Sequence, residues 1–355
     1  MADKYNKPHR AVYLYLFLIS FFIVLISANN PFNFRPSPED SFFSFTNFIT
    51  APGIYLAGIP GLWITELIFM FISVCFAWKT ALFFANPFIS FLGCLFSFII
   101  LLGFYTANTG AEVFSLPFLM ISLYLYVKYF MRQRREILFT ELIILGFCFA
   151  SAILIRFSLF PLWLGFGILI FLDLLFRRRF FLICRYINGF FIGTLIVFIP
   201  LYLYLRLEGI FDLIFSQHME NAAASLNGLN FVDTVRGFYS IIGSNFSFIP
   251  LIYGILFIII NFKSVIFYFY FAYSISYFLM ILLLAFSGGS SQNNIVLVPF
   301  FIAPLTFFIN IIYTFISRAG MGVKFRSTAL VLFLCIVFSE GILGYIYEII
   351  KLIYK

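Results

Sequence analysis

The sequence predicts an all-α integral membrane protein with about 11 transmembrane helices, because it combines a very apolar composition with long apolar runs. Hydrophobic residues make up 63% of the 355 residues and charged residues only 10%, whereas soluble domains carry about 25% charged residues. Many of the apolar runs approach the roughly 20 residues that a helix needs to cross a bilayer. This composition excludes an ordinary soluble domain.

Charged or Gly-, Pro- and Asn-rich breaks divide the chain into the apolar runs that we expect to form helices. The predicted spans are 11–28, 60–78, 81–104, 112–131, 137–155, 158–176, 183–205, 238–260, 264–286, 295–317 and 328–350. The first run follows basic residues, as in a signal peptide, but lacks a small-residue cleavage pattern, so we expect a retained span. We therefore expect a single polytopic membrane domain over residues 1–355.

The distribution of Lys and Arg predicts the orientation of the chain. With a cytoplasmic N-terminus, the outer face holds only six of the 22 Lys and Arg residues, namely Arg35, Arg156, Arg206, Arg236, Lys351 and Lys355. Since cytoplasmic loops are enriched in Lys and Arg, we expect an N-in/C-out, multi-pass protein of the plasma or inner membrane. The formal net charge of +8 is then an orientation signal, and no nucleic-acid partner is expected.

Two long outer loops, about 29–59 and 206–237, are the expected walls of a functional site, because long loops commonly carry function. In the first loop, the apolar residues of 42–49 recur at helical spacing, which predicts a helix lying in the outer membrane interface. Seven acidic residues also lie on the outer face, namely Glu39, Asp40, Glu112, Glu208, Asp212, Glu220 and Asp233.

The Glu39-Asp40 pair follows a Pro36-Ser37-Pro38 turn just beyond the first span. A carboxylate held at the membrane surface is suited to act as a general base on a hydroxyl group. The alternative is a purely structural role, since Asp is a good N-cap for the helix that follows.

Arg156 occupies a very short outer turn between two apolar spans, where an unpaired cation is costly. We expect an anionic partner, either a protein carboxylate such as Glu112 or a lipid phosphate, which the guanidinium fork matches. The alternative is an arginine that only extends to the lipid headgroups.

Four carboxylates fall inside predicted spans, where such groups are rare and usually face a cavity or a polar partner. They are Glu66, Glu141, Asp173 and Glu340. Glu66 follows Trp63 at helical i+3 spacing. For Glu141 and Asp173 we expect structural pairing with the nearby Arg134 and Arg177.

Neither a transition-metal site built from protein side chains nor a disulfide framework is expected from this sequence. The five cysteines lie in or beside apolar runs without a CxxC pair, which indicates small packing residues. The two histidines, His9 and His218, form no zinc motif. His218, in the second long loop, and Asn293, in the polar 287–294 loop, are candidate substrate-binding residues, although the 287–294 loop is equally suited to be a plain connector.

Several segments, in this order, resemble the bacterial GT-C superfamily of polytopic glycosyltransferases, and the mannosyltransferase-like members in particular. They cover roughly the first 220 residues. The segments are Pro38-Glu-Asp-Ser-Phe-Phe-Ser-Phe45, Ala51-Pro-Gly-Ile-Tyr-Leu56, Gly61-Leu-Trp-Ile-Thr-Glu66, Asn108-Thr-Gly-Ala-Glu-Val-Phe-Ser-Leu-Pro117 and Leu154-Ile-Arg-Phe157.

The resemblance implies transfer of a sugar from a polyprenyl-phosphate carrier to a glycan, lipid or protein acceptor at the extracytoplasmic face, as in cell-envelope polysaccharide biosynthesis. It gives the base role to Asp40, with Glu39 as the neighbouring candidate, and places Asn108, Glu112 and Arg156 along the outer cavity. The sugar, the acceptor and any divalent metal stay open.

The chain also departs from the family pattern. The first loop is short and lacks the second Asp and the Lys-Gly-Pro segment of related sequences, and Gln292-Asn293-Asn294 replaces a common His-Tyr pair. An enzyme with fewer catalytic groups and a catalytically impaired homologue both fit these departures. From other functional classes, a polysaccharide-precursor transporter or flippase and a polysaccharide polymerase stay open.

Overall fold

The structure, a computed structural model, describes residues 10–28, 52–102, 112–131, 136–155, 160–176, 178–207, 298–318 and 322–337, together with the single residues 209, 256, 259 and 350. This part of the chain is helical apart from short turns and contains no β-strand. The all-α class predicted from the sequence is therefore confirmed for the described residues. The helices are α1 (Arg10–Ala28), α3 (Ile59–Ala81), α4 (Pro87–Leu102), α5 (Glu112–Met131), α6 (Phe139–Ile155), α7 (Phe160–Phe176), α8 (Phe181–Leu207), α13 (Val298–Arg318) and α14 (Val323–Val337).

Most of these helices begin and end within a few residues of the predicted spans. One start was predicted too early: the run 81–104 begins as a helix only at Pro87. Residues 82–86 form a turn, and the Asn86 side chain accepts a hydrogen bond from the Ile89 N–H at 3.0 Å. Asn as N-cap followed by Pro at the first helical position is a strong helix start, and hydropathy does not detect it. The predicted spans 238–260 and 264–286 lie almost entirely outside the described residues.

Among the described residues, two helices are long and apolar enough to cross a membrane, Pro60–Ala81 and Phe181–Leu207. The other apolar helices in this part of the chain are shorter stretches of 10–17 residues.

Aromatic contacts show how α1, α3 and α5 run relative to one another. The rings of Phe69 and Phe114 lie 5.3 Å apart, and those of Phe76 and Tyr124 lie 5.4 Å apart. Residue numbers rise together on both helices, so α3 and α5 are parallel. Between α1 and α3 the order is reversed, with Tyr13 against Trp78 and Phe17 against Phe71. In a chain that crosses a layer repeatedly, consecutive long helices are antiparallel, and helices separated by one other helix are parallel. The directions of α1, α3 and α5 follow this rule.

Helices α6 and α8 are also parallel, and glycines let their backbones touch. A Cβ added at Gly146 would collide with the carbonyl group of Phe190, and one at Gly193 would collide with the carbonyl group of Ile143. Small residues at such contacts allow close helix packing. Helix α6 runs antiparallel to α5, as the Phe118–Phe147 and Lys128–Glu141 contacts show.

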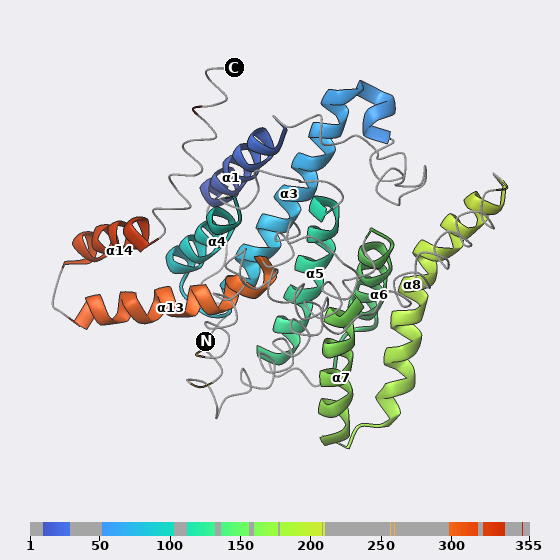
Figure 1. Cartoon of the computed structure of the whole chain (residues 1–355). Helices are drawn as coiled ribbons and strands as arrows, with labels where there is room; N and C mark the ends of the chain where they lie inside the picture. Colours follow the sequence, from blue (N-terminus) through green and yellow to red (C-terminus); the bar gives the residue numbers. More distant parts are fainter. Residues whose placement is uncertain are drawn as a thin grey trace, which may run out of the picture.

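The last two described helices depart from this arrangement. In Figure 1, α13 and α14 run across the direction of α3, α5 and α8 rather than alongside them. They pack on α4 through a separate apolar cluster of Ile89, Leu92, Phe96, Leu305, Ile309, Leu330 and Leu334. The larger core is formed by α1 and α3 to α8, with contributions from α13.

Candidate functional site

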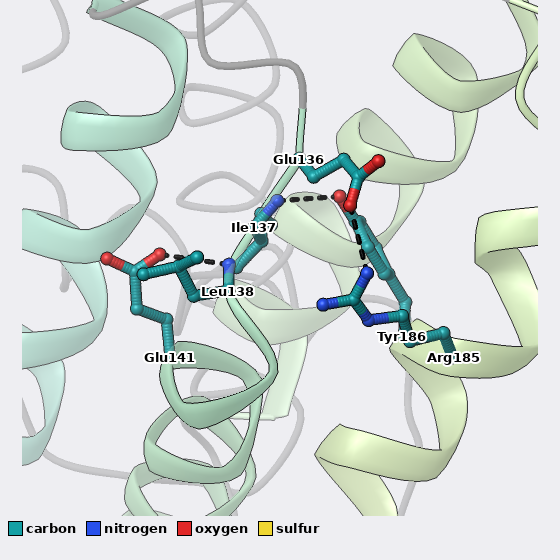
Figure 2. A network of polar contacts seen from close by, with 6 residues as sticks. All are labelled: Glu136, Ile137, Leu138, Glu141, Arg185 and Tyr186. Atoms are coloured by element: carbon teal, nitrogen blue, oxygen red, sulfur yellow. Dashed lines mark hydrogen bonds and ion pairs between the residues drawn. The ribbon is translucent and has the colours of Figure 1, made fainter.

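A network of polar contacts joins α6 and α8 at the end of the molecule where α6 and α8 begin (Figure 2). The backbone N–H of Ile137 donates to the Tyr186 hydroxyl group at 2.7 Å, and both residues are buried. Nearby, Arg185 forms an exposed ion pair with Glu136 at 2.9 Å. The Leu138 N–H donates to Glu141 Oε2 at 3.2 Å, so Glu141 caps the first turn of its own helix.

The same network extends to α5 and α7. The Lys128 ammonium group lies 2.7 Å from Glu141 Oε1, and the Tyr129 hydroxyl group donates to Asp173 Oδ2 at 2.6 Å. Glu141 and Asp173 therefore have structural partners, as expected. The expected partners Arg134 and Arg177 lie outside the described residues, and Lys128 and Tyr129 were not anticipated from the sequence.

These contacts connect four helices, α5 to α8, through groups that are already engaged with one another. Each buried charge that the network contains faces an opposite charge or a hydrogen-bond donor, which is the condition for burying it at low cost. The chemistry of this end is therefore that of a structural clamp.

A different situation is found near the start of α3. The Glu66 carboxyl group is buried, with 8% of the residue exposed, and no hydrogen bond or ion pair reaches it from the described residues. One turn earlier, Trp63 is 41% exposed. From Phe114, which packs on Phe69, to Lys128, which pairs with Glu141, the axis of α5 rises by about 20 Å. Glu66 and the network therefore lie at opposite ends of the α3–α5 pair.

A sharp bend at Gly58 joins the short helical segment 52–57 to the start of α3. Gly58 adopts φ 63°, a left-handed conformation that favours glycine. This turn folds residues 52–57 back onto the helix, so that Gly53 touches the Gly61 backbone with no space for a Cβ on either residue. The end of the first long loop is thereby packed beside Gly61 and Thr65.

An apolar groove of about 420 Å³ lies between the C-terminal halves of α6 and α8. It is lined by Leu154, Phe198, Ile199, Leu201, Tyr202 and Leu205. One turn beyond Tyr202, Arg206 donates from Nε to the Tyr202 hydroxyl group at 3.2 Å. The groove thus has an apolar lining and a cationic residue at its end.

Most of the sequence-predicted site residues fall outside the described residues, namely Glu39, Asp40, Asn108, Arg156, His218 and Asn293. Glu112 is described as the first residue of α5. Helix α6 ends at Ile155, immediately before Arg156. Because α6 is antiparallel to α5, this end of α6 and the start of α5 lie at the same end of the helix group.

The described residues contain no disulfide bond between cysteines. All five cysteines are free thiols, but only Cys75, Cys94 and Cys148 are buried, so the packing interpretation was wrong for the exposed Cys184 and Cys335. Across the described residues, no group of three or more His, Cys, Asp or Glu side chains is placed to hold a metal ion.

Comparison with known proteins adds no relative. No protein-family model, curated protein or solved structure matches the chain.

Proposed function

We propose that this chain is a multi-pass membrane glycosyltransferase that moves a sugar from a polyprenyl-phosphate-linked donor to a glycan, lipid or protein acceptor at the extracytoplasmic face. The proposal extends the GT-C resemblance of the sequence. It is supported by the surface of the helices, by the arrangement of the resembling segments and by the pairing of Glu141 and Asp173 with other side chains.

The surface of α8 supports the membrane assignment. Large apolar side chains are exposed on it from end to end, including Phe181, Ile187, Phe191, Ile196, Ile199 and Leu203. Exposure of this much contiguous apolar surface to water is strongly unfavourable, whereas lipid tails solvate it. The alternation between α1, α3, α5, α6 and α8 supports an N-in, multi-span arrangement for this part of the chain, whereas α13 and α14, which correspond to two of the 11 predicted spans, run across it.

The observation that carries the proposal is the convergence of the segments that resemble the family. The helical segment 52–57 and the start of α3 lie at the same end as the start of α5, because α3 and α5 are parallel and Phe69 packs on Phe114. The end of α6, which precedes Arg156, lies at that end too. The described segments that flank the first outer loop, Glu112 and Arg156 thus lie at one end of the helix group, which supports a site built from these residues.

The pairing of the carboxylates favours a transferase over a transporter. Transport coupled through intramembrane acids requires ionisable groups at successive depths along one path. Among the described residues, Glu141 is engaged with Lys128 and Asp173 with Tyr129. Glu66 lies at the other end of the α3–α5 pair, about 20 Å from them along the helix direction. This arrangement does not supply such a path.

The proposed reaction is a single displacement with inversion at the anomeric carbon. Asp40, or Glu39 beside it, takes the proton of the acceptor hydroxyl group as its oxygen attacks the anomeric carbon. The bond between that carbon and the phosphate oxygen breaks, and the polyprenyl phosphate leaves. Arg156 stabilises the negative charge that develops on the departing phosphate.

The test is a transfer assay with the full chain in lipid nanodiscs. Radiolabelled polyprenyl-phosphate sugars are supplied with cell-envelope acceptors, and both glycosylated product and free polyprenyl phosphate are measured. The proposal requires product from at least one donor and loss of product in the Asp40→Asn protein. Movement of intact lipid-linked sugar across a vesicle membrane, without any bond cleavage, would instead identify a flippase.

A further inference from the structure

Glu66 differs from the hydroxyl-bearing residues of α3. The hydroxyl groups of Thr65, Ser73 and Thr80 all donate to carbonyl oxygens of their own helix, at 2.8 to 2.9 Å. The Glu66 carboxyl group has no such partner among the described residues, although only 8% of the residue is exposed. Buried polar groups normally have a hydrogen-bond partner, and the described residues supply none for this carboxyl group.

The contrast with Glu141 strengthens this point. Glu141 is also 8% exposed, yet it receives hydrogen bonds from Lys128 and from the Leu138 N–H. The same protein therefore supplies partners for one buried carboxylate and leaves another without them. An unpartnered buried carboxyl group at one end of a helix group is the kind of group that a ligand completes.

The surroundings of Glu66 indicate the kind of ligand. Trp63 lies one turn earlier on a neighbouring position of the helix surface and is 41% exposed. The helical segment 52–57, at the end of the first long loop, packs through Gly53 on Gly61 and Thr65 of the same helix. Aromatic side chains with a few convergent polar groups are the usual lining of small-molecule sites, and a sugar offers an apolar ring face to the indole and hydroxyl groups to the carboxyl oxygens.

We infer that Trp63 and Glu66 form a sugar-binding subsite, in which the Glu66 carboxyl group accepts hydrogen bonds from sugar hydroxyl groups and the Trp63 indole packs against the sugar ring. The inference rests on the proposed function, which supplies a lipid-linked sugar at this end of the helices. It assigns a binding role to two residues of the segment Gly61–Glu66 and involves no bond-breaking step.

The test is equilibrium binding to the full chain in nanodiscs, with two kinds of probe. One is a set of polyprenyl-phosphate hexoses, and the other is the polyprenyl phosphate without sugar. Glu66→Leu and Trp63→Ala are each expected to weaken binding of the best hexose-carrying lipid by about 10-fold, the scale of a lost hydrogen bond to a charged group. Both variants should bind the sugar-free carrier within about twofold of wild type.

Two further variants control for loss of folding. Glu66→Gln keeps one carbonyl acceptor and should give an intermediate loss. Glu141→Gln is the matched control, because that residue is equally buried but lies in the network at the other end. It should lower the unfolding temperature while leaving the ratio of the two affinities unchanged.

The outcomes separate this inference from the proposed function. Equal weakening for both lipids in Glu66→Leu, or no preference of the wild type for the sugar-carrying lipid, would overturn the subsite. Wild-type binding preference without product formation would retain the subsite and refute the transferase. Wild-type rates and affinities in both Glu66→Leu and Trp63→Ala would refute the subsite and retain the transferase.

Discussion

Glu66 and Glu141 are equally buried, each with 8% of the residue exposed, yet within the described part of the chain only Glu141 has a cationic partner. The difference divides the α3–α5–α6 group into two ends. At one end, charges are paired and fix the helices. At the other, the Glu66 carboxyl group has no partner among the described residues, so substitutions at the two ends should have different consequences.

The Lys128–Glu141 pair should contribute to stability as a coupled unit. Loss of one partner leaves the other charge buried without compensation, which costs about 3 kcal/mol or more. We expect Lys128→Met and Glu141→Gln each to lower the free energy of unfolding by about this amount, while the double variant loses much less than the sum. Unfolding of the purified protein in a mild detergent checks this. Strict additivity would show that the two groups do not interact.

The Tyr186 hydroxyl group should matter because it satisfies a buried backbone donor. Tyr186→Phe removes the acceptor of the Ile137 N–H and should cost about 1–3 kcal/mol of unfolding free energy. Tyr202→Phe is the matched control, since its hydroxyl group bonds with Arg206 on an exposed surface. That change should cost less than about 0.5 kcal/mol. Equal effects of the two substitutions would contradict the assigned role of Tyr186.

The contact between α6 and α8 should tolerate no side chain at Gly193. Its Cβ would meet the backbone of Ile143, which cannot move aside as a side chain can. We expect Gly193→Ala to destabilise the protein by about 1–3 kcal/mol. In Gly167→Ala the new methyl group meets open space on α7, so this control should be neutral or stabilising by up to about 1 kcal/mol. Chemical unfolding of the two variants in parallel measures these changes in unfolding free energy.

The helices were largely predictable from the sequence, because apolar runs and the breaks between them determine where helices can form. The start of α4 was not, since the Asn86-Pro87 cap lies inside an apolar stretch and leaves no hydropathy signal. The exposure of Cys184 and Cys335 was also missed. An apolar neighbourhood in the sequence does not tell which face of a helix a residue occupies.

The polar partners of the clamp were not predictable from sequence spacing. Lys128 reaches Glu141 across the 132–138 connection, and Tyr129 reaches Asp173 from 44 residues away. The expected partners, Arg134 and Arg177, are the nearest cations along the chain. Tertiary packing of antiparallel helices selects partners by depth instead, so the residues on either side of a short connection are the better candidates.

The proposed topology predicts that the two long loops, 29–59 and 206–237, lie on the same, extracytoplasmic side, as the Lys and Arg distribution requires. In a cysteine-free background, Ser37→Cys and Ser225→Cys should be labelled in intact cells by a membrane-impermeant maleimide. Glu136→Cys, in an exposed turn expected on the cytoplasmic side, should react only after lysis. Protection of either loop position in intact cells would overturn the topology.

The assignment of the base makes the sharpest prediction about catalysis. A group that abstracts a proton loses that ability as an amide, so Asp40→Asn should reduce turnover by roughly 10²–10⁴-fold. Folding and donor binding should be retained, because the substitution preserves size and one carbonyl acceptor. Glu39→Gln should have a smaller effect, since the resemblance gives the base role to Asp40. Transfer is measured in nanodiscs at equal protein abundance, with unfolding temperature and donor affinity recorded on the same preparations. Wild-type turnover by the Asp40→Asn protein would remove the role from Asp40, and a larger loss in Glu39→Gln would transfer it to the neighbouring carboxylate.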